Sequence, residues 1–226
     1  MLRLLPILLL ILYLAAMWLF SSWRLKQELS QNSTPLNHPR LVPMLQLLGR
    51  AMDLKAVSAH VYEIAPVNGL AAPDGRIFLT RGFLDKLDEG KVTEAELASV
   101  IAHELGHVAH GHARRRMIDF AGQNAIRMVL GTMLRFVPFV GPWIANMVAA
   151  AVAARLSRQD EFEADAFASA LMIKAGLGTE PQKSLFRKLP GLTGNTATGP
   201  TWFLSHPPVK ERIAAIERLE AKWTQN

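Results

Sequence analysis

The residues best suited to chemistry lie together in the pentapeptide His103-Glu104-Leu105-Gly106-His107. Side chains four positions apart on a helix lie one above the other, so His103 and His107 can present two imidazoles to one metal ion. Glu104 reaches the same region without binding the metal, and there it can take a proton from a metal-bound water. The spacing therefore predicts two zinc ligands and a general base.

The residues around this pentapeptide predict the helix that such spacing requires. Thr93 and Glu96 form the pattern of a capping box, in which each side chain binds the backbone N–H of the other residue at a helix start. Apolar residues then recur at helical spacing from Leu97 to Val108. We therefore expect a helix within residues 93–116 that carries both histidines on one face.

A third ligand is expected in the acidic segment 156–165. Glu161 and Asp165 are four residues apart and share one face of a predicted helix. One carboxylate can complete a His-His-Glu site that leaves a position for water, and the other can accept the N–H of a ligand histidine. Glu163 points elsewhere by its spacing and is the weaker candidate. The longer pattern HExxHxxGxxH fails, because Ala113 stands where it needs a third histidine.

Composition restricts the metal site and the partners. The chain has 226 residues and no cysteine, so zinc must be held by His, Asp and Glu. His110 and His112 are out of register with the longer pattern, and we interpret them as surface residues or as residues behind the ligands. The arginine cluster at 114–116 suits anionic lipid or a plain solvated helix face. The chain lacks the basic and aromatic interleaving of nucleic-acid readers, so no nucleic-acid partner is expected.

The N-terminus predicts a membrane anchor. Residues 4–20 form an uncharged apolar run, with Trp18 and Trp23 available at the membrane interface. The run is longer than the apolar part of a signal peptide and lacks a clean cleavage site. We therefore expect a single-pass anchor over residues 1–25, in contact with membrane lipid. The distribution of basic residues on the two sides of this run weakly favours a cytoplasmic catalytic domain.

The remaining chain predicts a catalytic domain over residues 41–226, joined to the anchor by a polar linker over 26–40. A strongly apolar stretch, 126–156, interrupts this domain. One membrane crossing there would separate Glu161 from the histidines, and the stretch is too short for two crossings. We expect a helical hairpin that packs in the core, or that dips into the bilayer as a lid over the site.

The other elements predict an α+β fold, mostly helical, with a small β-sheet. Strands are expected over 57–64 and, after a turn at Pro73-Asp74-Gly75, over 76–80. Asn68-Gly69-Leu70-Ala71 is the candidate edge strand, which could pair with an extended substrate; an ordinary loop is the alternative. Amphipathic helices are expected over 42–51, 182–189 and 209–223.

Together these segments resemble the HtpX-like and CAAX-prenyl-protease-like zinc metalloendopeptidases, which are gluzincins. The pentapeptide at 103–107 and the sequence Ser-Arg-Gln-Asp-Glu-Phe-Glu-Ala-Asp at 157–165 carry most of the likeness. Shorter segments extend it on either side: 68–71, 75–78, 205–208 and 211–213.

The resemblance implies a zincin-like metallopeptidase domain with one zinc ion per chain. The implied roles are those of zinc ligands for His103, His107 and Glu161, general base for Glu104, and orientation of His103 for Asp165. One departure is Gly69, where the family usually carries alanine or serine. The resemblance also favours a periplasmic catalytic domain, which is opposite to the orientation that the basic residues favour.

The implied activity is hydrolysis of polypeptide substrates, in the quality control of membrane or envelope proteins. His206 is the candidate for stabilising the oxyanion that forms when an amide is attacked, and a histidine that packs before the last helix is the alternative. The competing function is a membrane-tethered chaperone or scaffold with a structural or latent zinc site, for which His206 would be the fourth ligand. The sequence leaves the oligomeric state open, a homo-oligomer included.

Overall fold

The computed structural model describes residues 5–72, 74–112, 140–192 and 208–224. The chain forms two compact units, one of residues 1–32 and 114–156, the other of residues 33–113 and 157–226.

Helices account for the described part of the first unit. Helix α1 (Leu5–Gln31) covers the predicted anchor and continues into the segment predicted as a linker. Helix α6 (Val140–Lys174) begins in this unit, so residues 140–156 belong to one continuous helix, while the earlier part of the predicted hairpin, 126–139, lies outside the described residues. Within the described ranges, no helix combines the length and apolar character that crossing a bilayer requires. The predicted membrane span is not confirmed.

The second unit contains a mixed four-stranded sheet of order β1-β2-β4-β3. Strand β1 (Ser33–Pro35) pairs antiparallel with β2 (Ala59–Tyr62), and β2 pairs parallel with β4 (Ile77–Thr80). Strand β3 (Gly69–Ala71) pairs antiparallel with β4 and occupies one edge of the sheet.

The predicted strands near 57–64 and 76–80 are therefore confirmed. They are not joined directly as an antiparallel hairpin, because β3 lies between them in the sequence. Gly75, with φ of +87°, closes a turn in which its N–H donates to the carbonyl of Ala72 over 2.9 Å. This turn joins β3 to β4 as a hairpin, since antiparallel neighbours need only a short link. Strand β4 lies parallel to β2, and residues 63–76 form the crossover between them.

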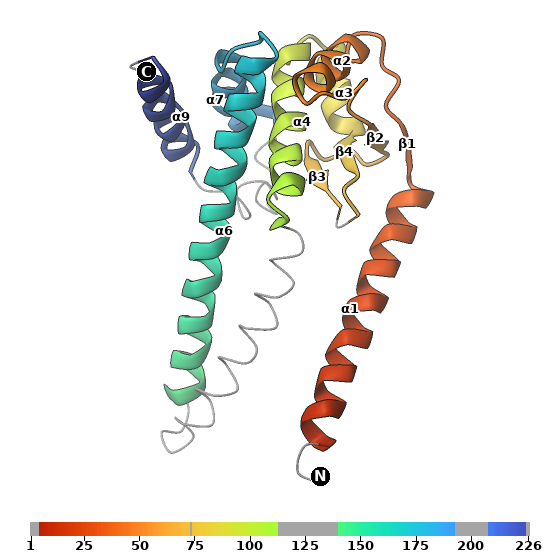
Figure 1. Ribbon diagram of the computed structural model, residues 1–226, viewed down its shortest axis with the longest axis vertical. Coiled ribbons are helices and arrows are strands. Elements are labelled where there is room, and N and C mark those ends of the chain that lie inside the picture. Colours follow the sequence, from red (N-terminus) through yellow and green to blue (C-terminus); the bar gives the residue numbers. More distant parts are fainter. Residues whose placement is uncertain (1–4, 73, 113–139, 193–207, 225–226) are drawn as a thin grey trace. The chain divides into compact units, whose positions relative to one another are not determined.

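Helices build the rest of the unit (Figure 1). They are α2 (Val42–Ala51), α3 (Arg81–Asp88), α4 (Glu94–Ala109), the C-terminal part of α6, α7 (Glu180–Leu192) and α9 (Val209–Trp223). Helix α4 packs on β3 and β4 and also contacts α2 and α7, so it runs through the centre of the unit. The helices predicted over 42–51, 182–189 and 209–223 are confirmed, as is the α+β, mostly helical class.

The start of α4 is fixed by the predicted capping box. The Glu96 N–H donates to Thr93 Oγ1 over 3.2 Å, and the Thr93 N–H donates to Glu96 Oε2 over 2.8 Å. The buried Glu96 carboxylate also accepts hydrogen bonds from Ser184 Oγ over 2.6 Å and Lys188 Nζ over 2.9 Å, both on α7. The cap therefore also ties the first turn of the central helix to α7.

The end of α4 comes earlier than residue 116. His110 is the C-cap, and Gly111 follows with φ of +66°, a left-handed conformation that glycine adopts without steric cost. Its N–H donates to the carbonyl of Val108 over 3.1 Å. The next residue, His112, is buried.

Candidate metal centre

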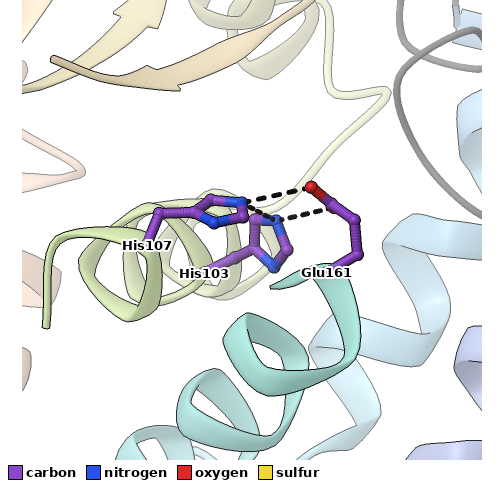
Figure 2. A group of neighbouring side chains, drawn as sticks. All are labelled: His103, His107 and Glu161. Atoms are coloured by element: carbon purple, nitrogen blue, oxygen red, sulfur yellow. Dashed lines mark hydrogen bonds and ion pairs between the residues drawn. The ribbon is translucent and has the colours of Figure 1, made fainter. Parts of the chain in front are cut away.

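Three buried side chains from two helices converge in the second unit (Figure 2). His103 and His107 extend from α4 and Glu161 from α6, with the two histidine Nε2 atoms 3.1 Å apart. Glu161 Oε2 lies 3.4 Å from His103 Nε2, and its Oε1 lies 3.4 Å from His107 Nε2. All three side chains thus direct a nitrogen or oxygen atom at one point.

The spacing of these atoms fits a zinc ion. In tetrahedral zinc sites the ligands lie about 2.0–2.1 Å from the metal, which places any two of them about 3.3–3.4 Å apart. His103 Nδ1 lies 2.9 Å from Asp165 Oδ1, so in the neutral imidazole Nδ1–H donates and the Nε2 lone pair faces the centre. Two imidazole lone pairs and a carboxylate at this separation repel one another unless a cation lies between them.

The raised pKa of His103 also indicates that this site favours a positive charge. Burial lowers its pKa, but hydrogen bonds with Asp165 and Glu161 outweigh burial and raise the pKa to about 9. A proton and a metal ion would compete for this nitrogen, since histidine binds metals in its neutral form.

Glu104 lies at the point where α4 meets the edge strand β3. A Cβ atom added at Gly69 would lie 3.2 Å from Glu104 Oε1 and 2.6 Å from Val100 Cγ1. The absence of a side chain at Gly69 therefore lets the strand approach α4 closely. The candidate substrate edge and the candidate base are neighbours.

Asp165 links His103 to a buried arginine on α9. Arg212 donates from Nε to Asp165 Oδ2 over 2.7 Å and from a terminal nitrogen to Oδ1 over 2.6 Å. Burial raises the pKa of Asp165, but the Arg212 charge and its hydrogen bonds outweigh burial, so the pKa lies below its ordinary value. Arg212 is 1% exposed, stacks on the Phe186 ring with its guanidinium carbon 4.2 Å from the ring centre, and lies 3.9 Å from Glu161 Oε2. One cation thus balances the carboxylates behind the centre.

A second set of contacts begins at the other histidine. His107 Nδ1 lies 2.8 Å from His112 Nδ1, and His112 Nε2 lies 3.1 Å from Glu163 Oε2 and 3.6 Å from Asp160 Oδ1. Both histidines of α4 therefore have a polar group at Nδ1, on the side away from the centre.

The close approach of α4 and α6 depends on Gly106. A Cβ atom there would lie 2.9 Å from the backbone of Ala164 and 3.2 Å from Phe167 Cβ. A larger residue would push the two helices apart. Glycine at this position of the pentapeptide is what allows the α6 carboxylates to reach the histidines of α4.

Comparison with known proteins agrees with this geometry. The chain matches peptidase family M48 over residues 35–220. The chain belongs to peptidase family M48. It is 30% identical over 181 residues to the metalloprotease YcaL of Escherichia coli K12, covering 78% of this chain and 67% of that protein.

Other M48 relatives extend the comparison. The E. coli K12 metalloprotease LoiP is 29% identical over 202 residues, covering 86% of this chain and 77% of LoiP. A protease HtpX homolog of Dictyoglomus thermophilum is 25% identical over 237 residues, covering 88% of this chain and 75% of that protein. The resemblance to HtpX-like peptidases is confirmed, and the chain is a metalloendopeptidase. M48 peptidases require a metal, usually zinc.

The structure brings together most, but not all, of the residues expected in the M48 site. His103, His107, Glu161 and Asp165 converge, Glu104 lies beside them, and Asn68–Ala71 runs along the edge of the sheet. His206 lies outside the described residues. Glu163 contacts His112 and does not belong to the group of His103, His107 and Glu161.

The sequence motifs alone do not predict a role for Arg212. The helical pattern nonetheless places Arg212 on the apolar face of the predicted last helix, together with Val209, Ile213 and Ile216. A charged residue on an otherwise apolar face predicts a buried partner of opposite charge. The sequence could not identify that partner.

Proposed function

We propose that this M48 peptidase hydrolyses peptide bonds with one zinc ion held by His103, His107 and Glu161. The observation that carries this proposal is the convergence of their buried ligand atoms. The two histidine Nε2 atoms lie 3.1 Å apart, and each lies 3.4 Å from one of the two Glu161 carboxylate oxygens. Among the described residues the group at this point has three members, which leaves room for water and substrate. The zinc would supply a Lewis acid that polarises the peptide carbonyl and makes water more acidic.

Glu104 acts as the proton carrier in this proposal. It is 3% exposed and directly follows a ligand histidine, so its carboxylate stands beside the centre without belonging to the converging group. It takes a proton from the attacking water and returns it to the leaving amine. His206 is proposed to donate to the oxyanion, on the basis of the sequence alone.

An extended polypeptide is the proposed substrate, bound along β3. This strand is the edge of the sheet, and its other side is paired with β4. Asn68 at its start is held by Thr80, whose N–H donates to the Asn68 carbonyl over 3.0 Å. A peptide added at the edge would exchange main-chain hydrogen bonds with Asn68–Ala71 and pass Glu104 next to Gly69.

Metal removal tests the function directly. We expect the purified full-length protein to cleave fluorescent casein, to lose that activity to background when zinc is chelated, and to recover it when zinc is restored. Glu161→Ala should fold but no longer retain zinc after gel filtration, because it removes one of three ligands. Metal content, measured by mass spectrometry, accompanies each assay. Cleavage that persists after the metal content has fallen to zero would contradict the proposal.

Chelation also separates the protease from a tethered scaffold with a structural zinc site. A scaffold would unfold or lose its partner when zinc is chelated. Unlike the protease, it would not cleave casein even with zinc bound. The family relationship and the three-membered ligand group both favour the protease.

We further propose that residues 1–25 hold the enzyme at a membrane and that it acts in the quality control of membrane or envelope proteins. The support is the uncharged apolar run 4–20, together with the resemblance to HtpX-like peptidases. We expect the full chain to sediment with membranes and to resist a high-salt wash, and a chain lacking 1–25 to be released. Equal membrane retention of both would refute this assignment.

A further inference from the structure

His112, which lies behind the ligand histidine His107, has no role in the proposed mechanism. It is completely buried, and its two ring nitrogens face different partners. Nδ1 lies 2.8 Å from His107 Nδ1, while Nε2 lies 3.1 Å from Glu163 Oε2 and 3.6 Å from Asp160 Oδ1. The group His112, Asp160 and Glu163 also has the geometry of a possible metal site. Two roles therefore compete: a second metal site, or a support for the first.

The hydrogen bond between the two Nδ1 atoms allows only one of these roles at a time. A neutral imidazole carries one N–H, and an N···N contact of 2.8 Å needs one donor and one acceptor. If His107 Nδ1–H donates, His107 Nε2 has a lone pair for the metal and His112 must carry its proton on Nε2. If His112 Nδ1–H donates, the proton of His107 is on Nε2, and His107 cannot bind the metal through that atom.

The carboxylates around His112 select the first arrangement. With a proton on Nε2, His112 donates to Glu163 and lies near Asp160, and both contacts are attractive. With a lone pair on Nε2, that lone pair would face carboxylate oxygens at 3.1 and 3.6 Å, and the contacts would be repulsive. Gln159 holds Glu163 in this orientation, because its Nε2 donates to Glu163 Oε1 over 2.9 Å.

We propose that His112 is a positioning residue that fixes the tautomer and ring orientation of His107, with Glu163 and Asp160 as the acceptors that fix His112 in turn. It does for His107 what Asp165 does for His103, but through a second imidazole. It follows that the His112, Asp160 and Glu163 group holds no second ion while His107 binds the first. The inference rests on the proposed role of His107 as a ligand. Residues behind metal ligands commonly contribute about 10–100-fold to metal affinity.

Zinc affinity, measured by competition with a coloured chelator on the full chain, tests the proposal. His112→Phe keeps a planar ring but offers His107 no acceptor, and we expect it to weaken zinc binding about 10–100-fold while retaining one ion per chain at saturation. His112→Gln retains an acceptor oxygen and an N–H donor, so it should recover most of the affinity. His110→Phe is the matched control, because His110 is an exposed histidine in the same turn, and it should bind zinc within about twofold of the wild type.

Three outcomes would overturn the proposal. They are unchanged affinity in His112→Phe, equal loss in His112→Phe and His112→Gln, and a wild-type chain that binds two ions, one of which is lost in Asp160→Asn. If His112→Phe does not fold, Glu163→Gln takes its place, because that residue is at the partly exposed end of the contacts, and a several-fold loss of affinity is expected. The same measurement separates this proposal from the proposed function. If the wild-type chain bound no zinc, the proposed zinc site itself would be wrong, whatever the variants showed.

Discussion

Glu104→Gln is expected to lower the rate of peptide hydrolysis by about 10²–10⁴-fold, the usual contribution of a general base, while zinc remains bound. Glutamine has nearly the same shape as glutamate but cannot accept the proton of the attacking water. Glu104 does not belong to the converging group of His103, His107 and Glu161, so the ligand atoms should be unaffected. The measurements are kcat on a fluorogenic peptide and the zinc content of the same preparation.

The same substitution at Glu161 is the control for this experiment. Glu161→Gln changes one carboxylate to an amide in an equally buried position, but here the carboxylate is a proposed ligand. We expect zinc to be lost from Glu161→Gln and retained by Glu104→Gln, although both variants should lose most of their activity. If Glu104→Gln kept more than about a tenth of the wild-type kcat, another group must remove the proton.

Arg212→Met is expected to lower the free energy of unfolding of the metal-free protein by about 3–5 kcal/mol, the typical cost of removing one partner of a buried ion pair. Arg212 is 1% exposed and binds both oxygens of Asp165. Without it, Asp165 would remain buried near two further buried carboxylates, Glu104 and Glu161, with no arginine to balance their charge. Urea unfolding with chelator present measures the change without the contribution of zinc.

A double-mutant cycle shows whether this loss arises from the ion pair. Asp165→Leu removes the carboxylate and leaves Arg212 buried, so it should also destabilise the fold. Because the two side chains interact directly, Arg212→Met combined with Asp165→Leu should cost less than the sum of the single changes. Additive losses, or a change below about 1 kcal/mol for Arg212→Met, would show that the pair does not stabilise the unit.

Local sequence patterns were enough to place the chemical groups on their elements. The i, i+4 spacing of His103 and His107, the capping box of Thr93 and Glu96, and the helices over 42–51 and 209–223 depend on contacts within a few residues. The same holds for the choice of His, Asp and Glu as ligand types, which follows from the lack of cysteine. Such features can be predicted because helix geometry and composition do not depend on the rest of the fold.

Pairing in the sheet was harder to predict. The turn at Gly75 was visible, but whether strand 76–80 returned to strand 57–64 or to the short strand between them depended on which backbone was available as a partner. The structure pairs β4 with both, parallel to β2 and antiparallel to β3. Three residues of β3 are too few to show a period of two in the sequence.

The sequence by itself predicted a His-His-Glu metal centre with a glutamate base. The spacing of His103 and His107 is a property of a single helix, and the family resemblance selected Glu161 as the third ligand. Only the tertiary structure decided what lies behind the ligands. Arg212 reaches Asp165 from 47 positions along the chain, and His112 reaches Glu163 from 51. Both contacts join segments that are far apart in the sequence, and the close approach of α4 and α6 at Gly106 depends on how the elements pack together.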